Sequence, residues 1–199
     1  TLQALSGYRD GAKRILVNQA IMRSDTGRDY HSDLLTLDAP FLIETIEQAF
    51  QTRESEWCRD LSFDDFCNYV LPYRLNSEPV FPVREKLQRH FMQWYHADSL
   101  QRDPLKVVSS LTDYVRLFSW DWADNSAAKP DLGFYNLLYW RNSRMDCPQL
   151  VAVMGSILHS IGLPAADLFT PRWGDTDLGH SWCYFPVGSG KPYLFTAFH

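Results

Sequence analysis

The feature that most constrains the fold of this chain is a change of hydrophobic period at Gly162. Before it, apolar residues recur at the three- and four-residue spacing that places them on one helix face. They are Leu150, Met154, Ile157, Leu158 and Ile161. Gly162, with Pro164 beyond it, is typical of a helix end. Residues 180–185 then alternate between two faces, as in a strand. The chain therefore predicts a helix over 147–161 followed by antiparallel strands.

The first part of the chain, residues 1–122, has the helical period in several places. After Pro40, one stripe contains Leu42, Ile43, Ile46, Ala49 and Phe50. Ser62 is the expected N-cap of a second helix that ends near Pro72. Its buried stripe would contain Phe63, Phe66, Cys67 and Val70. Residues 83–95 and 105–118 predict two more helices, each of which begins just after a proline.

The order of these segments predicts an α+β fold. Residues 121–131 are polar and turn-rich, so we expect a loop between a helical region, 1–122, and a core, 123–199. Whether the helical region is a separate domain or packs on the core stays open. In the core, a short strand at 166–171 precedes strand 180–185, and a hairpin-like turn at 187–191 leads into strand 192–198. That strand stops abruptly at His199, so we expect the natural chain to continue.

Composition excludes two classes of partner. Charged residues make up 22% of the 199 residues, and 24 acidic against 19 basic residues give a net charge of −5. A nucleic-acid binder would need basic clusters, which this sequence lacks. A transmembrane helix would need an apolar run of about 20 residues, and none approaches that length.

The four cysteines contain no C-x-x-C pair, so we predict no metal site. Cys147, His180 and Cys183 could be combined into one on paper, and this alternative stays open. Cys58 and Cys67 could form a disulfide in an oxidising compartment. Buried thiols are the more usual state for so few cysteines.

Cys147 and His180 are the residues most suited to chemistry. A cysteine becomes a nucleophile as its thiolate, which a helix N-terminus favours. Cys147 opens the predicted helix, after Asp146 as N-cap and before Pro148. His180 begins a strand that could pack across that helix end, on the opposite strand face from Cys183. The alternatives are a small buried cysteine and a core histidine. We interpret His159, inside the helix, as structural or on the surface.

Two runs resemble the transglutaminase-like superfamily, which has a papain-like fold. Residues 145–165 resemble its nucleophile helix and the turn that closes it, and 179–182, Gly-His-Ser-Trp, resemble its His-x-Trp strand. Residues 169–174 fit the segment between them. More weakly, residues 69–74 with Glu78 resemble bacterial members with a helical N-terminal part. The resemblance implies a thiol nucleophile at Cys147, a base at His180 and no cofactor. It also implies a protein of the bacterial envelope or a secreted protein.

The chain departs from the superfamily pattern at two positions. The strand after His180 contains no Asp or Glu to orient the imidazole, and Thr196 lies near the expected place. The acid could follow His199 or come from another loop, or the activity could be lost. Ala166 replaces an arginine that often follows the closing turn.

Further candidates are assigned to the cleft by residue type. Trp120 or Trp140 could add an oxyanion donor to the Cys147 N–H, although buried indoles usually have structural partners. Trp182, Tyr73 and Arg74 could line the cleft. A local ion pair between Arg74 and Glu78 is the simpler interpretation of Arg74.

Three functions are compatible with the sequence. The first is a cysteine-dependent acyl-transfer enzyme acting on peptide-like amides, as a peptidase or amidase rather than a protein cross-linker. The second is an inactive transglutaminase-like module that binds a partner. Its supporting features are the missing acid and the tryptophans Trp57, Trp94, Trp120, Trp122 and Trp173. The third is a metal-binding Cys/His site.

Overall fold

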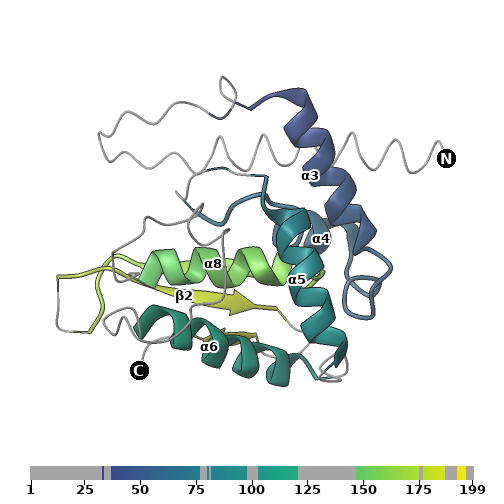
Figure 1. Ribbon diagram of the computed structural model, residues 1–199. Helices are drawn as coiled ribbons and strands as arrows, with labels where there is room; N and C mark the ends of the chain where they lie inside the picture. Colours follow the sequence, from purple (N-terminus) through teal and green to yellow (C-terminus); the bar gives the residue numbers. More distant parts are fainter. Residues whose placement is uncertain are drawn as a thin grey trace.

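The computed structural model describes residues 33, 37–76, 80, 82–97, 103–120, 147–174, 177–186 and 192–195. In chain order, the described elements are α3 (Ala39–Gln51), α4 (Phe63–Tyr69), α5 (Arg84–Ala97), α6 (Pro104–Trp120), α8 (Cys147–Ser160), β1 (Ala166–Thr170), β2 (His180–Phe185) and β3 (Tyr193–Phe195). The strands form one antiparallel sheet in the order β1-β2-β3. Figure 1 shows β2 alongside α8. Helices with a small antiparallel sheet confirm the α+β class. The predicted loop at 121–131 and the turn at 187–191 lie outside the described residues.

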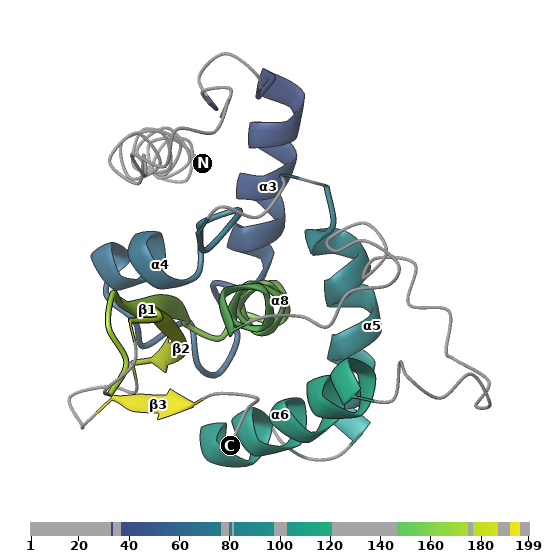
Figure 2. The ribbon, with the colours of Figure 1, turned by 90° about the vertical axis from the view of Figure 1, so that its left-hand side faces the viewer.

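Helix α8 is the centre of the molecule. Figure 2 shows it end-on, with the sheet on one side and α5 on the other, and α3 and α6 complete the surroundings. Its buried residues are Leu150, Val151, Ala152, Val153, Met154, Gly155, Ile157, Leu158, His159 and Ser160. The predicted apolar face is confirmed but too narrow. An amphipathic period describes a helix with one partner, whereas α8 is covered on several sides.

The end of α8 is the predicted glycine stop. Gly162 has φ 81°, a left-handed conformation that glycine adopts without steric cost. The Leu163 N–H donates to the Leu158 carbonyl at 2.9 Å, and the Gly162 N–H donates to the His159 carbonyl at 3.3 Å. These two bonds form a Schellman motif, which reverses the chain toward β1.

Strand register decides which side chains face α8. Asp167 lies opposite Cys183, and Thr170 lies opposite His180. Residues opposite each other in an antiparallel pair point to the same side of the sheet. Ser181, Cys183 and Phe185 are buried, and Cys183 and Phe185 belong to the core cluster that contains α8. His180, Trp182 and Tyr184 therefore occupy the other face.

The helices of the first half follow local signals. Ser62 caps α4 as predicted, accepting a hydrogen bond from the Asp65 N–H at 3.0 Å. Asp38 caps α3 in the same way through the Phe41 N–H, at 2.9 Å. The apolar stripe of this helix is not buried along its whole width, because Ile43 is 56% exposed. Helix α3 buries Thr45, Ile46, Gln48 and Ala49 instead, a face slightly rotated from the apolar stripe.

The helical region and the sheet share a core. One cluster of buried residues joins α5 and α6 to α8 and β2, through residues such as Phe91, Leu111, Met154 and Phe185. All four cysteines are present as thiols, with Cys58 and Cys67 buried in a second cluster beside α3 and α4. Within the described segments, none of the helices combines the length and apolar character that crossing a bilayer requires.

Candidate active site

Cys147 is the first residue of α8 and is partly accessible, whereas Cys58, Cys67 and Cys183 are buried. The first turn of α8 contains no acidic residue, so no charge on the helix itself opposes the positive end of its dipole. The unpaired N–H groups of a helix start favour a thiolate. Cys147 is therefore the cysteine whose position suits nucleophilic chemistry.

Burial makes the other cysteines poor candidates for the nucleophile. Burial, and secondarily the charge of Asp167, raises the pKa of Cys183 far above that of a free thiol. Burial also raises the pKa of Cys58 to about 11, against smaller opposing effects from Thr52 and Arg53. A thiol that stays protonated is a poor nucleophile.

A polar bridge connects the start of α8 to the sheet. The Asn76 side-chain amide donates to the Pro148 carbonyl at 3.3 Å and to Asp167 Oδ2 at 3.1 Å. The Ser181 hydroxyl donates to the same carboxylate oxygen, at the longer distance of 3.5 Å. Pro148 follows Cys147 and Ser181 follows His180 in the chain. The bridge therefore places Cys147 and His180 at the same end of the α8–sheet unit.

Asp167 is a site residue that the sequence analysis missed. It lies on β1, the strand before His180, whereas the acid was sought on the strand after it. Burial raises the pKa of its carboxyl, and hydrogen bonds from Asn76 and Ser181 partly oppose this. Its Oδ1 atom is buried with no partner among the described residues. The sequence did offer one signal for Asp167, because a charged residue inside a short strand beside a buried helix is unusual.

His180 is held by aromatic rings. Its imidazole stacks on Trp173, with ring centroids 5.0 Å apart and an angle of 27° between the planes. The Trp182 ring meets the imidazole edge-on, at 4.7 Å and 83°. Among the described residues, neither ring nitrogen of His180 has a hydrogen-bond partner. Trp182, predicted for the cleft, thus lies directly beside His180.

The structure brings Cys147 and His180 to one end of the sheet but does not join them. In the described part of the chain, no hydrogen bond connects the two side chains, and His180 lies on the sheet face away from α8. Catalytic hydrogen bonds are often long or poorly aligned before a substrate binds. His180 would in addition have to turn from its sheet face toward the start of α8, so the pairing stays a prediction.

The other predicted residues lie elsewhere or outside the described segments. The Tyr73 hydroxyl donates to Asp33 Oδ2 at 2.7 Å, and Arg74 forms an ion pair with the same carboxylate. The suggested partner Glu78, and the candidates Trp140 and Thr196, fall outside the described residues. So does the side chain of Trp120.

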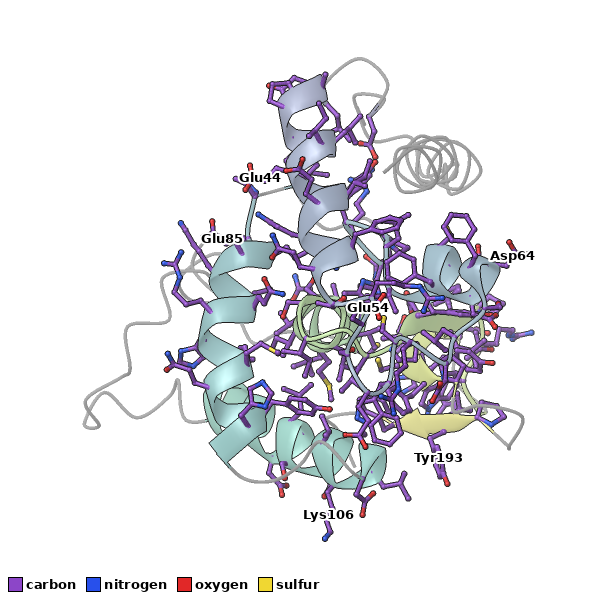
Figure 3. The ribbon with its side chains drawn as sticks, turned by 90° about the vertical axis from the view of Figure 1, so that its right-hand side faces the viewer. Glu44, Glu54, Asp64, Glu85, Lys106 and Tyr193 are labelled. Atoms are coloured by element: carbon purple, nitrogen blue, oxygen red, sulfur yellow. The ribbon has the colours of Figure 1, made fainter. Side chains whose placement is uncertain are left out.

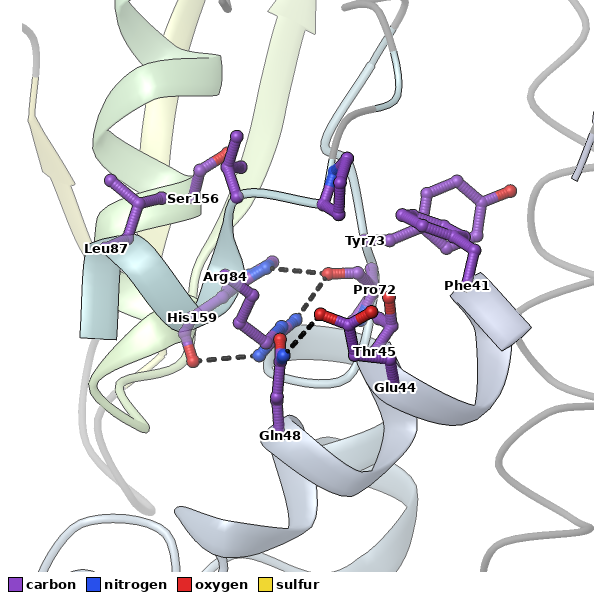
Figure 4. Close-up of a pocket in the computed structure, with 12 residues that line it drawn as sticks. Phe41, Glu44, Thr45, Gln48, Pro72, Tyr73, Arg84, Leu87, Ser156 and His159 are labelled. Atoms are coloured by element: carbon purple, nitrogen blue, oxygen red, sulfur yellow. Dashed lines mark hydrogen bonds between the residues drawn. The ribbon is translucent and has the colours of Figure 1, made fainter. Parts of the chain in front are cut away.

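Two cavities away from Cys147 offer no comparable chemistry. Figure 4 shows a pocket beside Arg84 and His159, near the opposite end of α8. Its volume is about 20 Å³, roughly the room for one water molecule. A wider groove of about 570 Å³ lies between α3 and α5, where Figure 3 labels Glu44 and Glu85. Its lining contains carboxylates, amides, Arg89 and Met92, without a cysteine or histidine.

Metal ligands do not gather in the described segments, where no group of three or more His, Cys, Asp or Glu side chains could hold an ion. No protein-family model matches the chain, and no curated protein or solved structure matches it either.

Proposed function

We propose that this protein is a cysteine-dependent acyl-transfer enzyme that cleaves peptide-like amides, with Cys147 as nucleophile and His180 as base. One observation carries the proposal. The partly accessible thiol opens the central helix, and the Asn76–Asp167–Ser181 bridge holds that helix end beside the start of the histidine strand.

In the proposed reaction the thiol proton passes to His180 as the Cys147 sulfur bonds to the amide carbonyl carbon. The C–N bond then breaks, the amine leaves with the proton from His180, and a thioester remains. Water attacks the thioester, which releases a carboxylate and restores the thiol. The N–H groups at the start of α8 would stabilise the oxyanion that forms in each half of the reaction.

The test is the rate at which iodoacetamide alkylates Cys147 in the folded protein between pH 5 and 9, with the site of labelling read by mass spectrometry. We expect labelling at Cys147 alone, because the other three cysteines are buried. The His180→Gln variant should react at least about tenfold more slowly near pH 6, where a free thiol is almost entirely protonated. A matched control is His96→Gln, which changes an exposed histidine of α5 and should leave the rate unchanged.

The proposal is wrong if alkylation is slow and independent of His180. It is also wrong if a fluorogenic peptide amide that the protein cleaves is cleaved equally well by Cys147→Ala.

A second candidate function, an interaction module without catalysis, is favoured by a different observation. Six large apolar side chains on the sheet and its β1–β2 connection are exposed: Leu168, Phe169, Trp173, Leu178, Tyr193 and Leu194. By strand register, Leu168 and Leu194 share the sheet face of Trp182, against which Trp173 packs, and exposed apolar side chains gathered on one face are typical of a contact surface. Slow alkylation without His180 dependence would favour this function over the enzyme.

A further inference from the structure

We propose that Trp173 is a positioning residue for His180, fixing the plane of the imidazole by stacking in place of a carboxylate hydrogen bond. This inference rests on the proposed function, in which His180 is the base. It concerns a residue of the β1–β2 connection that the proposed reaction does not yet use.

The three rings form a closed group. Trp173 stacks on the imidazole at 5.0 Å, Trp182 meets the imidazole edge-on at 4.7 Å, and the two indoles meet at 4.9 Å and 70°. Each distance is within the range of favourable ring pairs. An imidazole bounded by one face and one edge cannot rotate about its Cβ–Cγ bond without losing one of these contacts.

Trp173 is itself held by the connection between the strands. The backbone N–H of Trp173 donates to the backbone carbonyl of Leu178 at 2.9 Å. This bond ties the two ends of the loop together. The preceding residue, Arg172, forms an ion pair with Asp177 across the same loop. Its carbonyl accepts a hydrogen bond from the Thr170 hydroxyl at 2.9 Å. Gly174 has φ 60°, a left-handed conformation that glycine adopts without steric cost.

The contrast with His159 indicates what the ring contacts achieve. Both nitrogens of His159 lie next to carbonyl oxygens, of Pro72 at 3.1 Å and of Ala165 at 2.9 Å. The nitrogen that carries the proton donates to one of these carbonyls, and the other carbonyl faces the second nitrogen, so polar groups cover both nitrogens of His159. Stacking instead fixes the ring of His180 through its faces. Within the described residues, no hydrogen bond occupies either nitrogen of His180, so both are available for proton transfer.

The stack also suits the charge that the base must carry. When His180 takes the thiol proton, it becomes an imidazolium, and the negative face of an indole attracts a cation. Asp167 is the acidic residue of β1, the strand next to His180. Its side chain is on the α8 side of the sheet, where it accepts hydrogen bonds from Asn76 and Ser181. The indole of Trp173 supplies both orientation and charge stabilisation on the face where His180 lies.

The first test is a structural readout that does not depend on activity. We would record the imidazole C–H resonances of His180 by NMR, assigned with His180→Gln. Ring currents of Trp173 should displace them from the positions of a histidine in an unstructured peptide. Trp173→Leu, which keeps an apolar side chain but removes the ring, should move them back toward those positions. Trp173→Phe should retain part of the displacement. Tyr193→Leu, an exposed aromatic of β3, is the matched control and should have no effect.

The second test is a double-mutant cycle on the alkylation rate of Cys147. Trp173→Leu should lower the rate about fivefold, as expected for the loss of a cation–π contact, and Trp173→Phe should restore most of it. In the His180→Gln background, Trp173→Leu should cause no further loss, because Trp173 acts through His180.

The outcomes separate this inference from the proposed function. The inference is overturned if Trp173→Leu leaves the resonances in place, or if it lowers the rate equally with and without His180. The same holds if it leaves the rate unchanged while His180→Gln lowers it, but in that case the proposed function stands. A rate that is independent of His180 overturns both.

Discussion

At the residue scale, His159 is the group that should dominate the response of the fold to acid. It is 2% exposed, and each of its ring nitrogens faces a carbonyl oxygen. A neutral imidazole carries one N–H and donates to one of the two. Burial first, and the charge of Arg84 second, lower its pKa to about 4, against the opposing effect of the carbonyl groups.

This shift predicts a loss of stability between pH 6.5 and 4. The histidine titrates near 6.5 in the unfolded chain, so the unfolded state binds more protons across this window. The free energy of unfolding should therefore fall as the pH is lowered from 6.5 to 4, by up to about 3 kcal/mol, and stay level above it. Urea unfolding at a series of pH values would measure this.

His159→Gln provides the comparison, because glutamine does not titrate. We expect a flatter profile from pH 6.5 to 4 in this variant, whatever its stability at pH 7. The raised pKa of Asp167 acts in the opposite direction in both proteins, so the difference between them isolates His159. An identical slope in both proteins would contradict the assignment.

Single residues were predictable where their role depends on near neighbours in the chain. The Ser62 cap and the Gly162 stop follow from residues within a few positions, and both are confirmed. Asp167 was missed because its partner Asn76 lies 91 positions away, and no local pattern records such a distance. The pairing of Cys147 with His180 stays a prediction for the same reason.

At the scale of elements, the position of Gly155 explains how closely α8 packs. A Cβ atom at this glycine would lie 2.1 Å from Leu75 Cδ2 and 2.9 Å from Leu75 Cγ. Leu75 is buried, so its side chain has little room to move away. Glycine is therefore required in the middle of a helix, where its intrinsic propensity is poor.

Gly155→Ala should consequently destabilise the protein. An alanine would normally stabilise a helix interior by about 1 kcal/mol, but overpacking of a core costs about 1–3 kcal/mol and should dominate. We expect a net loss of up to about 2 kcal/mol by chemical denaturation. Leu75→Ala should cost less in the Gly155→Ala protein than in the wild type, because it removes the clash. Strictly additive effects would show that the two residues do not compete for space.

Element positions followed from the sequence more closely than element surroundings. The helical periods and prolines gave helices close to α3, α4, α5, α6 and α8 as observed. The periodicity did not reveal that α8 is covered on several sides or that Ile43 faces outward. Both depend on which elements meet in space. The likeness to transglutaminase-like proteins, drawn from short runs, stays a prediction.

At the scale of the whole molecule, one buried side chain connects distant segments. Arg84, at the start of α5, donates to the His159 carbonyl at 2.9 Å (Figure 4). It also donates to the carbonyls of Val70, Leu71 and Pro72, at 2.9, 3.2 and 2.8 Å. Burial lowers its pKa to about 10, so it remains charged at neutral pH. Five donors in one plane suit this set of acceptors.

Removing this side chain should weaken the entire fold. Arg84→Met would leave the buried carbonyls without donors, and we expect the free energy of unfolding to fall by about 3–5 kcal/mol. Arg84→Lys should recover part of the loss, since an ammonium keeps the charge without the planar fork. The control is Arg89→Met in the same helix. Arg89 forms an exposed ion pair with Glu85, worth less than about 1 kcal/mol. Equal effects at Arg84 and Arg89 in urea titrations would contradict this account.

The central position of α8 also has a consequence for the order in which the protein can be made. Helices α3, α5 and α6 each pack on α8, yet α8 follows all of them in the chain. Until a ribosome has released residues 147–160, the buried sides of the earlier helices have no partner in the middle. Domains generally fold as units once their core is complete. Synthesis must therefore pass α8 before this core can close, and the apolar sides of the earlier helices stay exposed until then.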